Sequence, residues 1–159
     1  MEHHHLNLVH NIPFFSIFFA MFCGIITPLI KSGRVARYVH GAMVAIVGVL
    51  SAVLLVNVVQ NGEAFTFMMG HFPAPWGNEL RVGPLEALLA VLISVVMFLT
   101  ITAGSEQLFK EIVPEKQNFY FIMLNATFGA MLAMTYTNDM FTAYVFIEIL
   151  TIASCTLIL

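Results

Sequence analysis

Residues 140–159 read MFTAYVFIEILTIASCTLIL, an apolar run that contains a single carboxylate, Glu148. A transmembrane α-helix needs about 20 predominantly apolar residues, so this run is long enough to cross a membrane. An ionised carboxylate at the centre of such a helix costs about 2.5 to 3.5 kcal/mol on insertion scales. Glu148 is therefore expected to face protein or a water-filled path, and it indicates a membrane protein that handles a cation, with H⁺ the first candidate.

The whole chain has the composition of an integral membrane protein. Of its 159 residues 60% are hydrophobic and 9% are charged, whereas a soluble domain has about 25% charged residues. We expect an all-α fold that forms a single transmembrane domain over residues 1–159. Its five transmembrane helices are predicted at residues 12–30, 38–60, 84–104, 119–136 and 140–159. The first segment lacks a basic flank and a small-residue cleavage site, so we interpret it as a span and not as a signal peptide.

The basic residues predict the orientation of the chain in the membrane. Five of the six lie in the first and third connections, namely Lys31, Arg34, Arg37, Lys110 and Lys116, and only Arg81 lies in a connection of the opposite parity. Cytoplasmic loops carry an excess of Lys and Arg. The N-terminus is therefore expected outside and the C-terminus in the cytoplasm.

Several classes of chemistry are not indicated by the sequence. Cys23 and Cys155 lie within spans without ligand spacing, and a free cysteine usually behaves as a small apolar residue. No phosphate-binding loop, nucleic-acid-binding stripe or nucleophile elbow is present. We expect no cofactor, no metal, no catalytic site and no nucleic acid, with lipid and other membrane subunits as partners. The histidines at residues 3–5 are interpreted as a solvated polar end, in preference to a metal site or a tag.

The connections contain turn and helix signals. Residues 72–77, FPAPWG, predict turns with Phe72 and Trp76 at the membrane interface, and the alternation in residues 79–82 predicts a short extended stretch. Residues 105–114 predict a short interfacial helix that Ser105 caps and Pro114 ends.

Three residues are expected on the helical face of Glu148, namely Tyr144, Thr151 and Cys155. Glu148 lies about 13 Å along the helix from Asp139 at 1.5 Å per residue, near the middle of the hydrocarbon core. Tyr144 and Thr151 are four residues before it and three after it, so we expect them beside it on the ion path. We expect this polar face to point into protein or water.

Three other polar residues are possible supporting groups. Glu86 falls in the first turn of the third span, where the helix dipole favours a carboxylate, and an interfacial role is preferred for it. Asp139 is placed to cap the fifth helix. Asn125 needs a hydrogen-bond partner in lipid, and a packing role is preferred for it.

The fifth span also carries a family resemblance. Residues 137–154 match the pattern D-x-F-x-x-Y/F-V-F-x-E-x-L-x-x-x-S at Asp139, Phe141, Tyr144, Val145, Phe146, Glu148, Leu150 and Ser154. This stretch resembles the fifth helix of the antiporter-like subunits found in respiratory complex I, in multisubunit (Mrp-type) Na⁺/H⁺ antiporters and in membrane-bound hydrogenases. Residues 73–80, PAPWGNEL, resemble the loop before the third helix, and the chain aligns with the N-terminal part of a family member.

The resemblance implies a role for Glu148 and a multi-pass location in a prokaryotic cell membrane. In the family, the fifth-helix carboxylate is essential and pairs with a lysine on a later helix, so that protonation of the pair is coupled to charge movements in neighbouring subunits. A Lys–Glu pair in a low dielectric has strongly coupled pKa values, which suits that role. None of the five predicted spans contains a lysine, so we expect another chain to supply it.

The resemblance leaves more than one function open. The leading hypothesis is a cation-translocation subunit, part of a split subunit within a membrane arm attached to a redox module or an Mrp-like assembly. The alternative is a structural subunit that anchors a hydrogenase or oxidoreductase to the membrane without pumping. A third hypothesis is a small exporter that works alone. H⁺ and Na⁺ both remain open as the ion.

Overall fold

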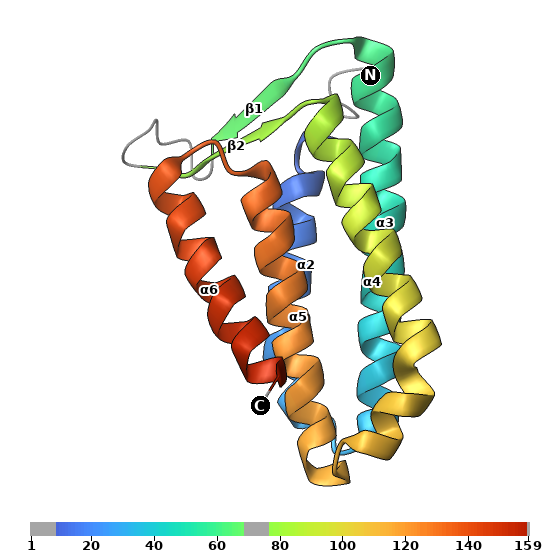
Figure 1. The fold of residues 1–159 in the computed structure, drawn as a ribbon. Helices are drawn as coiled ribbons and strands as arrows, with labels where there is room; N and C mark the ends of the chain where they lie inside the picture. The colour runs from blue at the N-terminus through green and yellow to red at the C-terminus, as the bar shows by residue number, and fades with distance from the viewer. Residues whose placement is uncertain (1–8, 69–76, 159) are drawn as a thin grey trace.

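A computed structural model describes residues 9–68 and 77–158 of the chain and places five long helices side by side (Figure 1). All five are long and apolar enough to cross a membrane, which confirms the predicted helical fold. In chain order the elements are α2 (Ile12–Ile26), the 3-10 turn η1 (Thr27–Leu29), α3 (Gly33–Asn61), β1 (Phe65–Met68), β2 (Glu79–Val82), α4 (Pro84–Glu111), α5 (Pro114–Tyr136) and α6 (Met140–Ile158). The histidines at 3–5, Phe72 and Trp76 lie outside the described residues.

Proline and glycine set several helix ends. Pro13 lies in the first turn of α2, where its missing N–H is tolerated, and Pro28 ends that helix in the turn η1. α3 ends at Gly62, whose φ of 69° is in the left-handed region that favours glycine. α3 begins at Gly33, five residues earlier than predicted, so Arg34 and Arg37 lie in its first turns and not in a loop.

The predicted short helix over residues 105–114 is wrong as a separate element. α4 continues without a break from Pro84 to Glu111, because the change from apolar to charged residues after Gly104 introduces no helix breaker. Ser105 is buried and its hydroxyl bonds the carbonyl of Thr102 at 3.3 Å instead of capping a helix. The break comes at Pro114, which forces the preceding Val113 into an extended conformation and then starts α5.

The predicted extended stretch at residues 79–82 is confirmed as β2. It pairs antiparallel with β1, with Phe65 opposite Val82, and the hairpin lies across one end of the bundle (Figure 1). The hairpin is also attached to the α5–α6 connection, because the amide of Asn138 bonds the carbonyl of Glu79 at 2.8 Å. The hairpin therefore joins the end of α5 and the start of α6 to the rest of the structure.

α5 is the central helix and α6 is the peripheral one. α5 contacts α2, α3, α4 and α6, whereas α6 packs mainly against α5. In the most apolar 18-residue stretch of α5 56% of residues are buried, compared with 6% in that of α6. Most of the α6 surface is therefore not covered by the other four helices.

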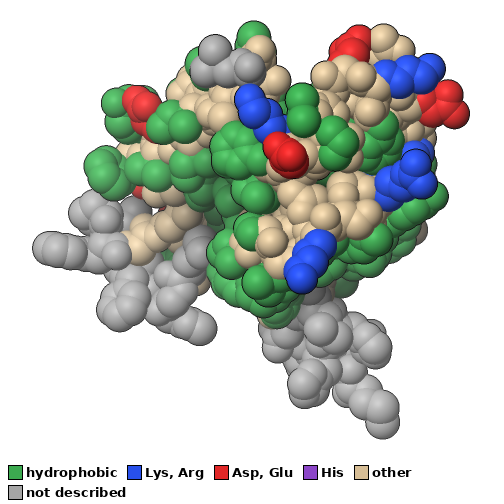
Figure 2. Space-filling model, turned by 90° about the horizontal axis from the view of Figure 1, so that it is seen from below, with side chains coloured by type: hydrophobic (Ala, Val, Ile, Leu, Met, Phe, Trp, Pro, Cys, Tyr) green, Lys and Arg blue, Asp and Glu red, His purple; other side chains and the backbone are tan. Residues whose placement is uncertain are grey.

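The opposite end of the bundle from the hairpin is basic. Lys and Arg side chains gather there together with acidic ones, as seen from below in Figure 2. The helix ends are packed closely at this point: a Cβ on Gly33 of α3 would come within 2.7 Å of the Cβ of Gln117 on α5. Clustering of the basic residues at one end is the arrangement that the predicted orientation requires, and the orientation itself stays a prediction.

Candidate functional site

Glu148 lies on the exposed side of α6. The face of α6 that packs on α5 is centred on Ala153, the one buried residue among those described in this helix. At 100° per residue, Tyr144, Glu148 and Thr151 point to the opposite side of the helix, and all three are exposed. We call Tyr144, Glu148, Thr151 and Cys155 the polar stripe of α6. The prediction that these residues share one face is confirmed by this geometry, and the stripe points away from the other four helices.

Local contacts on the stripe leave the carboxylate of Glu148 available. The hydroxyl of Tyr144 interacts with this carboxylate one turn away. The hydroxyl of Thr151 donates to the backbone carbonyl of Glu148 at 2.9 Å, so it is engaged with its own helix. Among the described residues no ion pair to Glu148 is formed. The stripe is thus an open acidic site with one phenol beside it.

Asp139 caps α6, as predicted. Its Oδ2 accepts hydrogen bonds from the Thr142 amide at 2.9 Å and from the Thr142 hydroxyl at 2.7 Å. These bonds hold the pKa of Asp139 below its usual range, with the side-chain bond the larger cause. Asp139 therefore fixes the start of the helix and lies at its end, away from the middle of the stripe.

Glu86 and Asn125 each have a structural partner away from Glu148. Glu86 accepts a hydrogen bond from the Gly83 amide at 2.8 Å, which completes the N-terminus of α4. Asn125 lies fully buried in α5 and bonds His40 and Thr27. The structure therefore groups Tyr144, Glu148 and Thr151, and it does not bring Asn125, Asp139 or Glu86 to them.

His40 is a polar residue of the interior that was not among the predicted site residues. It is fully buried on α3, and its Nδ1 lies 2.6 Å from Oδ1 of Asn125 on α5. The signal was present in the sequence, because an ionisable residue within a membrane span is a functional candidate by default. Its partner could not be read from the sequence, because residues 40 and 125 meet only through the packing of α3 on α5.

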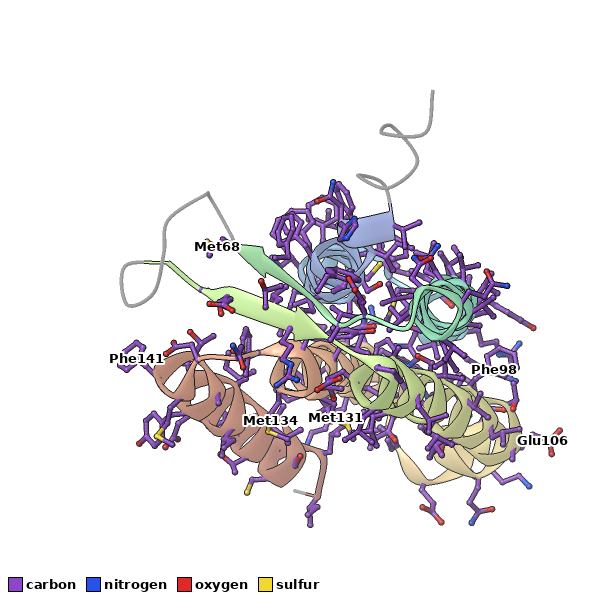
Figure 3. All side chains as sticks on the ribbon, turned by 90° about the horizontal axis from the view of Figure 1, so that it is seen from above. Met68, Phe98, Glu106, Met131, Met134 and Phe141 are labelled. Carbon is purple, nitrogen blue, oxygen red and sulfur yellow. The ribbon has the colours of Figure 1, made fainter. Side chains whose placement is uncertain are left out.

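Figure 3 shows two edges of the bundle from above, with Phe141 at the outer edge of α6 and Glu106 at the far edge of α4.

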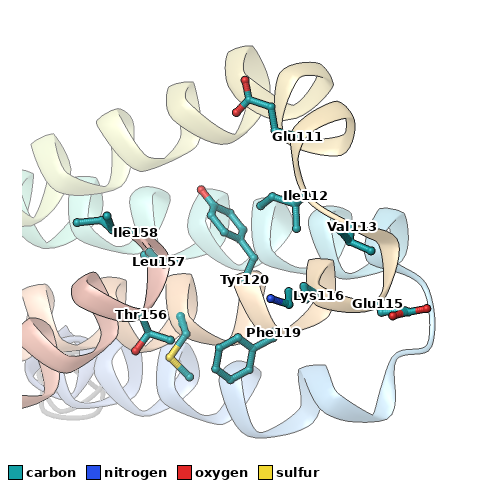
Figure 4. Close-up of a pocket in the computed structure, with 11 residues that line it drawn as sticks. Glu111, Ile112, Val113, Glu115, Lys116, Phe119, Tyr120, Thr156, Leu157 and Ile158 are labelled. Atoms are coloured by element: carbon teal, nitrogen blue, oxygen red, sulfur yellow. The ribbon is translucent and has the colours of Figure 1, made fainter.

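A pocket of about 660 Å³ lies at the basic end, between the end of α4, the start of α5 and the end of α6. Its lining combines apolar Phe119 and Leu157 with charged Glu111 and Lys116 (Figure 4). Glu148 is not part of this lining, so the pocket and the polar stripe are separate features.

Comparison with known proteins identifies relatives of the chain. It is 34% identical over 107 residues to NADH-quinone oxidoreductase subunit N of Desulforudis audaxviator, a match over 67% of this chain and 21% of that protein. It is 30% identical over 133 residues to an Na⁺/H⁺ antiporter subunit of Alkalihalophilus pseudofirmus, a match over 80% of this chain and 25% of that protein. No family model matches the chain.

Two solved structures share the fold. A chain in the structure of a membrane-bound sulfane sulfur reductase, an archaeal respiratory membrane complex, superposes with a TM-score of 0.71 at 24% identity, over 93% of this chain and 28% of that one. A chain in the structure of the Mrp complex from Dietzia sp. superposes with a TM-score of 0.77 at 13% identity, over 92% of this chain and 26% of that one.

The five long apolar helices and these relatives define a multi-pass membrane protein. The relatives also show its kind: the chain belongs to the antiporter-like family of membrane subunits, as the fifth-helix motif predicts. It spans about a fifth to a quarter of the length of the curated relatives that it matches, at 21% and 25%.

Proposed function

We propose that this chain provides an intramembrane cation-handling carboxylate, Glu148, to a larger membrane complex, and that H⁺ is the first candidate for the cation. The observation that carries the proposal is the direction of the polar stripe. Glu148 and Tyr144 are exposed on the side of α6 opposite α5. A carboxylate in that position needs a partner from outside the five helices, because lipid cannot solvate it.

The surroundings of the stripe favour a protein neighbour over bulk lipid. Large apolar side chains flank it, with Phe141 76% exposed and Ile152 64% exposed. A second membrane helix on this face would cover both the apolar flanks and the polar line between them. Once covered, the carboxylate would lie in a low dielectric, where its charge state depends strongly on a neighbouring cation.

The described part of the chain has no counter-charge at the depth of Glu148. α6 carries no Lys or Arg, Lys110 lies in the last turn of α4, and Lys116 lies in the first turn of α5. The family resemblance implies a lysine on a further helix, which we expect on another chain. A carboxylate and an ammonium group brought together in this way would exchange protons readily when the distance between them changes.

The names of the relatives support an ion-translocating assembly. One is a subunit of an NADH-quinone oxidoreductase and the other a subunit of an Na⁺/H⁺ antiporter. The second name keeps Na⁺ open beside H⁺, since a carboxylate with a nearby phenol and hydroxyl can bind either ion.

A second function, that of a non-pumping membrane anchor, is favoured by one observation. The exposed surface of α6 is mostly apolar, and such a surface suits static packing against another membrane subunit. In that case the carboxyl group of Glu148 would be neutral and would only hydrogen-bond a neighbouring helix.

The variant Glu148→Gln separates these functions because it keeps the size of the side chain and removes its charge. Ion transport and subunit content are measured together in membrane vesicles that contain the assembled complex. We expect assembly at the wild-type level and at least a tenfold loss of transport, a change of about 1.4 kcal/mol in the barrier.

The matched control is Glu106→Gln, which removes an exposed carboxylate at the far edge of α4 and should leave transport unchanged (Figure 3). Normal transport by Glu148→Gln would overturn the proposal, and loss of assembly would favour the anchor. Transport by the purified chain alone would instead support an independent exporter.

A further inference from the structure

A buried hydrogen-bond chain crosses the bundle from α3 through α5 to the end of α2. Nδ1 of His40 is 2.6 Å from Oδ1 of Asn125, and Nδ2 of Asn125 donates to Oγ1 of Thr27 at 3.2 Å. Oγ1 of Thr27 in turn donates to the carbonyl of Cys23 at 2.6 Å. His40, Asn125 and Thr27 are all fully or almost fully buried.

The direction of this chain fixes the tautomer of His40. The carbonyl of Cys23 can only accept, so the single hydroxyl proton of Thr27 is committed to it. Thr27 must then accept from Asn125, which places the amide NH₂ of Asn125 toward Thr27 and its oxygen toward His40. Because that oxygen can only accept, Nδ1 of His40 carries the proton and is the donor.

Nε2 of His40 is therefore the basic nitrogen of the neutral ring. It is buried, and no described residue forms a hydrogen bond to it. An apolar group lies nearby, since the ring of Phe121 is 6.1 Å from the His40 ring between centroids. A lone pair in such a place has lost its water without gaining a protein donor, which is uncommon for a buried polar atom.

The hydrogen bond from Nδ1 to Asn125 favours a positive ring and opposes the cost of charging a side chain that is fully buried. A hydrogen bond from a charged donor is stronger than one from a neutral donor, so the bond from Nδ1 to Asn125 strengthens when the ring is protonated. The hydrogen-bond chain ends on the carbonyl of Cys23, in the last turn of α2. Pro28, which ends α2, directly follows Thr27 of this network.

We propose that His40 is a buried proton-binding site, separate from Glu148 and beyond the function proposed above. Nε2 of the neutral ring accepts a proton from water, forming an N–H bond and an imidazolium, and releases the same proton by breaking that bond. Nδ1–H stays bonded to Asn125 throughout. His40 lies seven residues past Gly33, about 10 Å from the basic end at 1.5 Å per residue, so water from that end is the source of the proton.

The neighbouring titratable groups are largely at the helix ends. On the elements around His40 they are Cys23 of α2, Arg34, Arg37 and Tyr38 of α3, Glu86, Glu106, Lys110 and Glu111 of α4, and Glu115, Lys116, Tyr120 and Tyr136 of α5. Of these, Cys23 and Tyr136 are buried, Arg37, Glu86 and Tyr120 are half-buried, and the others are exposed. His40 is thus the basic side chain of the described interior.

The test is an NMR titration of the full chain in lipid nanodiscs, with ¹⁵N in the histidine rings. The variant His40→Gln removes one pair of ring signals and so assigns them. Near neutral pH we expect a protonated Nδ1 and an unprotonated Nε2. Acidification should convert the Nε2 signal reversibly to the N–H form while the helix content, followed by circular dichroism, stays constant. An Nε2 signal that does not change while the chain stays folded would overturn the proposal, as would the opposite tautomer.

Two further variants test the role of the network. Asn125→Ala removes the acceptor and should convert the single tautomer of His40 to a mixture, whereas the control Asn61→Ala, at the exposed end of α3, should leave it unchanged. If Asn125→Ala does not fold, Thr27→Val serves, because it frees the Asn125 amide to rotate. An unchanged single tautomer in the folded variant would contradict the proposal. Because the readout needs no transport, its failure is distinct from failure of the Glu148 experiment.

Discussion

The buried bond between His40 and Asn125 should contribute measurably to the stability of the helix bundle. Asn125→Ala removes hydrogen bonds of 2.6 Å to His40 and 3.2 Å to Thr27, both between different elements of the fold. The perturbation is therefore a loss of two tertiary contacts at one buried position, with a small cavity in place of the amide.

The expected magnitude follows from the number of bonds and their setting. Hydrogen bonds between transmembrane helices contribute about 0.6 kcal/mol on average and up to about 1.7 kcal/mol in double-mutant cycles. The short bond to His40 belongs in the upper half of that range, so a cycle of Asn125→Ala and His40→Ala should give a coupling energy of about 1 to 1.7 kcal/mol. The single variant Asn125→Ala should lose more than this, because Thr27 also loses its donor.

The assay is the free energy of unfolding of the full chain in mixed micelles, obtained by titration with a denaturing detergent. The matched control cycle uses Asn57 and Asn61, which form an exposed hydrogen bond of 2.9 Å one turn apart on α3. That pair should give a coupling of about 0.2 to 0.5 kcal/mol, as for other side-chain pairs on a helix surface. Additivity of His40→Ala and Asn125→Ala within about 0.3 kcal/mol would refute the reasoning.

Two other features of the fold give predictions of their own. Gly33→Ala should destabilise the bundle, because the new Cβ would meet Gln117 on α5. Gly104→Ala should be neutral or stabilising, because no atom lies within 4 Å of the new Cβ. Thermal unfolding of the two variants measures the difference in stability. Asp139 should stabilise the start of α6 at neutral pH, and because its pKa is lowered in the folded state, this contribution should be lost as the pH falls below about 4. The stability difference between the wild type and Asp139→Asn should therefore shrink on acidification, and a difference that is constant with pH would exclude this role.

The sequence predicted the helices well because apolar run length is a strong signal in membrane proteins. The predicted helix ends were less accurate where a helix continues into a charged, polar stretch of sequence. Residues 105–111 become charged without losing helical propensity, so α4 continues past the expected end at Gly104. Similarly, a loop was predicted at Arg34 and Arg37 because both are charged, but they lie in the first turns of α3. Pro114, which acts on the backbone directly, predicted the real boundary between α4 and α5, and the predicted starts at residues 12, 84 and 140 match those of α2, α4 and α6.

The candidate site could be predicted only in part, because helical spacing does not determine how helices pack. Helical spacing alone is enough to place Tyr144, Glu148 and Thr151 on one face, and the structure agrees. Spacing does not say which way that face points, because this depends on how α6 packs on α5 through Ala153. The pairing of His40 with Asn125 was out of reach for the same reason, since residues 85 positions apart meet only in the assembled bundle.

The proposed function requires that the carboxyl group of Glu148 takes up and releases a cation when its complex works. Infrared difference spectroscopy on the assembled complex, with and without turnover, measures this directly through the carboxyl C=O stretching band. We expect a carboxyl band that appears and disappears with turnover in the wild type and is lost in Glu148→Gln, while Glu106→Gln retains it. A Glu148 carboxyl group that stays in one protonation state throughout proton-driven turnover would contradict the account.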